Sequence, residues 1–281
     1  MGDEDKVETP AAGEARKEKD EGKTEEDLGG RMTFLQHLEE LRRRLIVSLL
    51  TVAGVFMVIY SSPWVYDPIR KFFMQPLQDV VKNYGTFQFT SIAEGFEFNV
   101  KLSAAAAVFI SAPMLFYQAW AFIAPGLYKK ERRYVAPFIF FSTFFFLAGS
   151  AFFYFIAFPM GARFFASFAQ ADLIQFNPKL DDTFSFVTVM VMAFGLIFEL
   201  PLIAFILARL HIINIALMNK YRRWAILLIF IIAAIITPPD VLSQILVALP
   251  MWALYEVSAL VVWIFGPKAK KPGEETIAEK S

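Results

Sequence analysis

The chain has 281 residues, of which 57% are hydrophobic, 16% aromatic and only 19% charged. This composition is too apolar for an ordinary soluble domain and indicates an all-α membrane protein. The absence of cysteine excludes disulfides and thiolate nucleophiles, and two histidines, His37 and His211, are too few for a histidine-rich metal site. We therefore expect no metal and no other cofactor.

The first thirty residues differ from the rest of the chain. Residues 1–30 hold eleven Asp and Glu against five Lys and Arg, whereas the remainder holds sixteen against twenty-two. A segment so polar cannot bury enough apolar surface to offset the entropy lost on ordering, so we expect a disordered acidic tail. It has neither the basic and apolar regions of a signal peptide nor the composition of a transit peptide. We expect an uncleaved N-terminus of bacterial type.

Residues 31–266 are predicted to form one membrane domain, followed by a polar cytoplasmic tail at 267–281. Crossing a bilayer core of about 30 Å takes roughly 20 apolar residues of helix. Six stretches are candidates: 43–61, 96–118, 135–158, 184–208, 222–237 and 242–265. The fifth is short, because its run from Trp224 to Ile236 ends at a Thr-Pro-Pro sequence. The last two stretches therefore form either a tight hairpin or a pair of undersized spans.

Basic residues beside the spans predict the orientation. The richer flanks and loops carry Arg31, Arg42, Arg43, Arg44, Lys129, Lys130, Arg132, Arg133, Arg209, Lys220, Arg222, Arg223, Lys268, Lys270 and Lys271. The alternate loops are poorer and carry Arg70, Lys71, Lys82, Arg163 and Lys179. Because cytoplasmic loops carry the excess of Lys and Arg, both termini are predicted to be cytoplasmic.

The segment His37–Leu45, H-L-E-E-L-R-R-R-L, places two carboxylates among three arginines at the start of the first span. Basic residues alone are enough to fix the orientation of a membrane span, so the added carboxylates suggest a surface that holds a charged peptide. In the 119–134 loop, Glu131 is a lone acid among four cations. It forms either an ordinary ion pair within the loop or, together with Glu40 on the same membrane face, a receptor for guanidinium groups.

Glu199 lies well inside the fourth apolar stretch, two residues before Pro201. An ionisable group at that depth is costly, so it is expected to face a partner, a hydrated cavity or a proton pathway; the alternative is a structural hydrogen bond to a neighbouring helix. Pro201 removes a backbone donor and favours a kink.

Two further acidic residues have ordinary structural explanations. Glu97 and Lys101 are four residues apart and are predicted to pair along one helix face. Asp240 follows two prolines, where an N-cap would explain it.

Enzyme signatures are missing: there is no H-E-x-x-H, no G-x-S-x-G and no Walker glycine loop. A membrane-embedded enzyme is therefore disfavoured. The main alternative to a peptide receptor is a proton-coupled small-molecule transporter in which Glu199 carries the proton.

Four segments together resemble the C component of the twin-arginine protein translocase, over about residues 33–266. They are H-L-E-E-L-R-R-R-L, S-A-P-M-L-F-Y-Q-A-W-A-F-I-A-P-G-L-Y-K-K-E-R-R, F-G-L-I-F-E-L-P and I-T-P-P-D-V-L-S-Q. The resemblance implies six transmembrane helices in a concave, glove-like bundle in the bacterial inner membrane. It also implies a receptor for signal peptides with consecutive arginines on proteins exported in the folded state.

By this resemblance, Glu40 and Glu131 would receive the arginine pair, and Arg42 and Phe122 would shape the site. The doubled Glu39-Glu40 leaves two candidates for the first acid; we choose Glu40, which immediately precedes Leu-Arg.

Other residues receive roles by the same resemblance. Glu199 and Gln244 would be polar points on the concave intramembrane face, Pro76 would lie in the first external cap, and Asp240 in the last external turn. Expected partners are small single-span amphipathic proteins of the TatA and TatB type, membrane lipids and further copies in a larger complex, with no nucleic acid. Export would use the proton-motive force. The long acidic N-terminal tail departs from the family pattern.

Overall fold

The computed structural model describes residues 34–82, 86–123, 135–167, 177–237 and 241–266. These residues are almost entirely helical and include an isolated β-bridge between Gln88 and Lys179. The elements are α2 (Phe34–Ser61), α3 (Pro63–Val81), α4 (Glu94–Ile123), α5 (Val135–Phe152), the π-helical turn η3 (Phe153–Ala157), α6 (Phe158–Ser167), α7 (Leu180–Ile197), α8 (Leu200–Arg209), α9 (Ile215–Ile236) and α10 (Val241–Phe265). The all-α fold expected from the sequence is confirmed.

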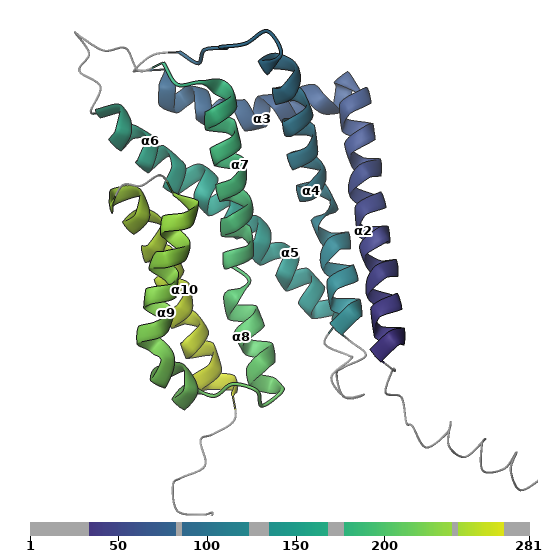
Figure 1. The fold of residues 1–281 in the computed structure, drawn as a ribbon, viewed down its shortest axis with the longest axis vertical. Coiled ribbons are helices and arrows are strands. Elements are labelled where there is room, and N and C mark those ends of the chain that lie inside the picture. Colours follow the sequence, from purple (N-terminus) through teal and green to yellow (C-terminus); the bar gives the residue numbers. More distant parts are fainter. Residues whose placement is uncertain (1–33, 83–85, 124–134, 168–176, 238–240, 267–281) are drawn as a thin grey trace, which may run out of the picture.

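The helices form an upright bundle that α3 crosses at one end (Figure 1). α2 packs along α4, α5 leans across the bundle and packs on α4 and α7, and α10 packs on α8 and α9. The first residue of α2 and the last residue of α10 lie at the end of the bundle opposite α3 (Figure 1).

Five helical segments among the described residues are long and apolar enough to cross a membrane: Gln36–Ser61, Glu94–Ile123, Ala136–Ser167, Leu180–Arg209 and Ser243–Phe265. They match five of the six expected spans, and the first four are longer than expected. The remaining span lies in α9, whose apolar run of thirteen residues, Trp224 to Ile236, is only about 20 Å long at 1.5 Å per residue. The suggestion of two undersized spans is therefore wrong for α10. A sixth crossing stays a prediction.

Polar contacts join α9 to α10. Arg222 donates from Nε to Glu256 Oε1 at 2.8 Å and from Nη2 to Glu256 Oε2, which is the two-pronged geometry that guanidinium and carboxylate favour. The Tyr255 hydroxyl donates to the Met218 carbonyl at 2.8 Å. These contacts support the expected hairpin.

Two glycines set the distance between α5 and α7. A Cβ atom on Gly149 would lie 2.5 Å from the carbonyl oxygen of Phe194, and one on Gly195 would lie 2.7 Å from the ring of Phe146. Small residues let helix backbones approach closely in membranes, where apolar burial does not by itself drive association. The Ser150 hydroxyl adds a hydrogen bond of 3.1 Å to the Val191 carbonyl. The crossing of α5 and α7 is thus a close backbone contact.

The rod formed by α5 and α6 contains the π-helical turn η3, an interruption that changes the direction of side chains beyond it. Tyr154 lies in this turn, is buried, and donates its hydroxyl to the Phe73 carbonyl in α3. This hydrogen bond fixes α3 to the body of the bundle.

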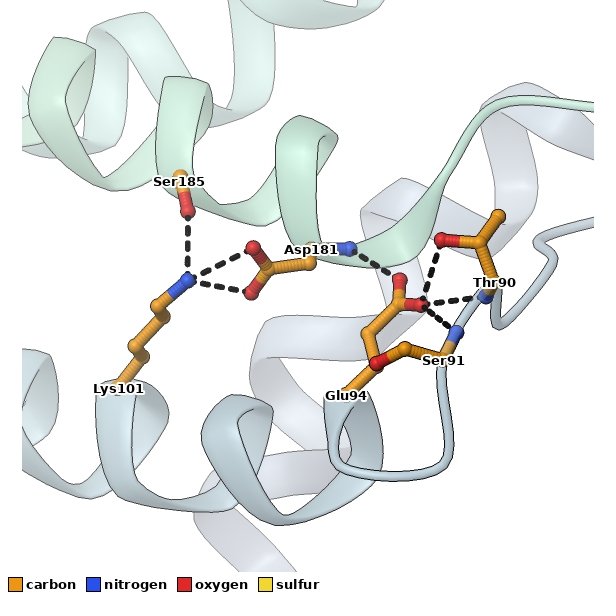
Figure 2. A network of polar contacts seen from close by, with 6 residues as sticks. All are labelled: Thr90, Ser91, Glu94, Lys101, Asp181 and Ser185. Atoms are coloured by element: carbon orange, nitrogen blue, oxygen red, sulfur yellow. Dashed lines mark hydrogen bonds and ion pairs between the residues drawn. The ribbon is translucent and has the colours of Figure 1, made fainter.

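Near α3, a carboxylate joins the start of α4 to the start of α7 (Figure 2). Glu94 is buried and accepts from the Thr90 and Ser91 amides at 2.5 and 3.2 Å and from the Thr90 hydroxyl at 3.1 Å. Its second oxygen accepts from the Asp181 amide at 3.2 Å. Glu94 therefore satisfies donors from the segment before α4 and from the first turn of α7, and its charge lies at two helix N-termini, where a negative charge is favoured.

Lys101 pairs across helices, and the predicted pair with Glu97 on its own helix is wrong. Its Nζ lies 2.6 and 2.7 Å from the two oxygens of Asp181 and donates to Ser185 Oγ at 3.4 Å (Figure 2). Asp181 is in the first turn of α7, which lies beside α4, and so offers both carboxylate oxygens together. Glu97 is exposed.

Candidate functional site at the start of α2

The segment His37–Leu45 is helical, because α2 begins at Phe34, nine residues before the expected span. Residues four apart share one helix face, so Glu40 and Arg44 point the same way, towards the last turns of α4. The charged motif is thereby held on a helix that continues into the membrane span. A rigid helix positions these side chains better than a loop would.

Glu40 is half-buried and engaged by Arg44. The Arg44 guanidinium donates to Glu40 Oε1 from Nε at 3.0 Å and from Nη2 at 2.5 Å. Its Nη1 donates to the side-chain oxygen of Gln118, on α4, at 3.2 Å. The other carboxylate oxygen, Glu40 Oε2, is buried and has no donor among the residues that the structure describes. Among the described residues, one oxygen of this carboxylate therefore has unused accepting capacity.

An aromatic contact continues this surface along α2 and α4. The rings of His37 and Phe122 stack with centroids 4.3 Å apart and an interplanar angle of 20°. His37 precedes Glu40 by one turn, and Phe122 follows Gln118 by one turn. Together they form what we call the α2–α4 strip: His37, Glu40, Arg44, Gln118 and Phe122.

The structure brings together two of the predicted site residues, Glu40 and Phe122. Arg42 is exposed and, at 100° per residue, lies on the opposite side of α2 from Glu40. Glu39, the rejected acid, is also exposed. Sequence reasoning missed Arg44 and Gln118 as members of the site. The spacing of four residues from Glu40 could have revealed Arg44, whereas Gln118 is 74 residues further along the chain and no sequence signal pointed to it.

The remaining predicted residues lie elsewhere or outside the described part of the chain. Glu131 and Asp240 are outside the described residues. Pro76 is half-buried inside α3, the helix that crosses one end of the bundle. Gln244 lies in the first turn of α10 and donates from Nε2 to the Phe230 carbonyl of α9 at 3.0 Å.

Glu199 lies where α7 ends and α8 begins, one residue before the first residue of α8. The expected interruption of the helix is confirmed: Pro201 is in the first turn of α8 and cannot donate a backbone hydrogen bond. The Glu199 side chain is buried and hydrogen-bonded to Ser142 of α5.

A chain of donors leads to this carboxyl group. Trp120 Nε1 donates to Ser142 Oγ at 2.9 Å, which leaves the serine proton for Glu199. The second oxygen, Glu199 Oε1, is buried without a donor among the described residues. Glu199 thus links α4, α5 and the α7–α8 junction, and one of its oxygens accepts from no group in the described part of the chain.

These groups offer chemistry for recognition of a cationic group. The α2–α4 strip presents a carboxylate and an aromatic face, which suit a guanidinium group. Within the described residues, no cluster of three or more His, Asp or Glu side chains could hold a metal ion.

Comparison with known proteins identifies the family. The model of the family TatC, Sec-independent protein translocase protein, matches residues 36–250. The TatC protein of Desulforapulum autotrophicum is 40% identical over 248 residues, covering 88% of this chain and 90% of that protein. The TatC protein of Helicobacter pylori strain 26695 is 41% identical over 236 residues, covering 83% and 88%.

Solved structures agree with the sequence comparisons. A crystal structure of the twin arginine translocase receptor TatC superposes with a TM-score of 0.71 at 30% identity, over 80% of this chain and 97% of the other. A second crystal structure of this receptor, in DDM, gives a TM-score of 0.72 at the same identity, over 80% and 99%. The chain is a multi-pass membrane protein that belongs to the TatC family of Sec-independent protein translocase components.

Proposed function

We propose that this protein is the signal-peptide receptor and core component of a twin-arginine translocation system, which exports folded proteins across the bacterial inner membrane using the proton-motive force. The observation that carries the proposal is the half-buried Glu40 carboxylate on the α2–α4 strip, one oxygen of which has no donor within the part of the chain that the structure describes. Both termini would lie in the cytoplasm, since the described ends of α2 and α10 are at the end of the bundle that carries this strip (Figure 1). A transport role requires no catalytic residues, and we propose none.

In the docking step, one arginine of the signal peptide binds Glu40, and the other binds Glu131. A carboxylate accepts a guanidinium fork through two hydrogen bonds but holds a lysine only as a point charge. The rings of His37 and Phe122 then provide an apolar and aromatic surface one turn away from Glu40. Arg42, on the other side of α2, would act on the peptide or on lipid phosphates only through its charge.

Partner assembly is proposed at the membrane-embedded polar groups. Glu199 keeps one buried oxygen without a donor among the described residues, so a polar group on a TatA- or TatB-type helix could pair with it. Gln244, together with Pro76 and Asp240 at the external end, would complete the contact surface for partners and further copies. The alternative, a proton-coupled transporter that uses Glu199, is not favoured, because the matched relatives are named as protein translocase components.

The thinnest part of the membrane would lie beside α9. Its apolar run covers about 20 Å, against about 30 Å for a bilayer core, and a short span is accommodated by local thinning. α10 is long enough to cross and would not add to this thinning. The proposed thinning is therefore confined to the α9 side of the hairpin.

Binding of labelled signal peptides to the purified protein in lipid nanodiscs tests the docking step. An Arg-Arg peptide is expected to bind more tightly than its Lys-Lys counterpart, and Glu40→Gln is expected to remove that advantage. Glu39→Gln is the matched control, because it removes the same charge from the exposed neighbouring position. Equal binding of the Arg-Arg peptide to Glu40→Gln and wild type would refute the proposed receptor site.

A further inference from the structure

We infer that Arg44 is an internal substitute for the signal-peptide arginine, held in the Glu40 site until an incoming guanidinium displaces it. The inference rests on the proposed receptor function and adds a step to it. In the structure, the carboxylate that would receive a guanidinium holds one from its own helix.

The geometry differs from that of a common surface ion pair. Exposed pairs four residues apart on a helix contribute little, because both side chains stay solvated and mobile. Here the side chains of Arg44 and Glu40 are only 17% and 13% exposed. A third group, Gln118 from α4, accepts from the guanidinium at 3.2 Å, so three contacts from two helices hold Arg44 in place.

The free oxygen of Glu40 provides a route for exchange. Both nitrogens of Arg44 that reach the carboxylate donate to Oε1, and the buried Oε2 has no donor among the described residues. An arriving guanidinium can therefore bind Oε2 when the side chains that cover this oxygen shift, and take over Oε1 as Arg44 leaves. The carboxylate keeps at least one charge-assisted hydrogen bond throughout, which avoids the cost of an unpaired buried charge.

This arrangement also protects the site when no cargo is present. A buried carboxylate without a counter-charge would attract other cations, including lysines of unrelated chains. A ligand that displaces Arg44 must replace a forked contact, and only another guanidinium reproduces that geometry. Arg44 thus competes with every cationic peptide for Glu40, and it lowers the measured affinity of each peptide that binds.

Peptide affinity in nanodiscs, measured on Arg44 and Gln118 variants, tests the inference. Arg44→Gln is expected to raise the affinity for an Arg-Arg peptide about tenfold, because a half-buried charge-assisted contact no longer competes. Gln118→Met removes an anchor of Arg44 without a change in charge and is expected to raise the affinity about threefold by the same competition. Arg43→Gln is the matched control, since it removes an equal charge from the exposed adjacent position.

Whether Arg44→Gln raises or lowers the peptide affinity decides whether Arg44 competes with the peptide or supports its binding. Weaker binding by Arg44→Gln, or a gain no larger than that of Arg43→Gln, would overturn the inference and make Arg44 a residue that orients Glu40. Glu40→Gln, measured in parallel, separates this result from failure of the receptor function: if it binds the peptide as wild type does, the docking site itself is refuted. Absence of binding by wild type with binding by Arg44→Gln would support displacement, and absence in both would overturn both proposals.

Discussion

Replacing Gly149 by alanine should separate α5 from α7 and destabilise the bundle. The added Cβ would lie 2.5 Å from the Phe194 carbonyl oxygen and 2.6 Å from Phe198 Cγ. The first of these atoms belongs to a helix backbone, so it cannot move aside as a side-chain end could. Overpacking of this kind costs about 1–3 kcal/mol.

Gly54 provides the matched control. It also lies inside a helix, α2, but a Cβ there would meet nothing within 4 Å. Both alanine variants share the gain of about 0.5–1 kcal/mol that alanine has over glycine in a helix. The difference between the two variants therefore isolates the cost of the clash, and we expect Gly149→Ala to be less stable than Gly54→Ala by about 1–3 kcal/mol.

The assay is reversible unfolding in mixed micelles of increasing SDS fraction, followed by the fluorescence of the five tryptophans. Gly149→Ala should unfold at a lower SDS fraction than wild type, and Gly54→Ala at an equal or higher fraction. Equal midpoints for the two variants would show that α5 and α7 do not meet through Gly149.

Three further outcomes follow from the polar contacts, each measured with the same unfolding assay. Glu94→Gln should lower the free energy of unfolding by about 1–3 kcal/mol, because a charged acceptor of several backbone amides is lost. Glu97→Gln, at the exposed neighbouring position, should have almost no effect. Similar losses in both variants would count against the network of Figure 2. A double-mutant cycle of Lys101→Met and Asp181→Asn should give a coupling energy of only about 1 kcal/mol, since the lysine is partly exposed and its charge is screened. A coupling energy of zero would show that the two side chains do not interact. Trp120→Phe should lower the free energy of unfolding by about 1–2 kcal/mol, because it removes the donor to the buried serine of α5, in addition to any lost packing. Unfolding at the same SDS fraction as wild type would show that this donor is not needed.

Much of the fold was predictable from local patterns. Long apolar runs predicted five of the spans, and Pro201 predicted the interruption between α7 and α8, because both signals act within a few residues. The same local reasoning gave the wrong partner for Lys101. It considered only a residue on the same helix, whereas Asp181 is 80 positions away and becomes a neighbour only when α4 and α7 pack.

The candidate site was predictable only in part for the same reason. Glu40 could be chosen over Glu39 because it immediately precedes Leu41 and Arg42, and the structure places it on the half-buried side of α2. Gln118 could not be found, since an uncharged amide near the end of an apolar span gives no signal until α2 and α4 are placed together. Burial and free acceptor capacity are properties of the packed helices.

The ion pair between Arg222 and Glu256 also bears on how the chain enters the membrane during synthesis. With thirteen apolar residues after Arg222 and Arg223, α9 is too short to insert stably by itself. Its arginine finds its carboxylate only when α10 has been made, and the pair then ties the two helices together. We therefore expect α9 to wait at the insertion machinery and to enter the bilayer together with α10, so that a chain truncated before Glu256 would leave its last helix outside the lipid.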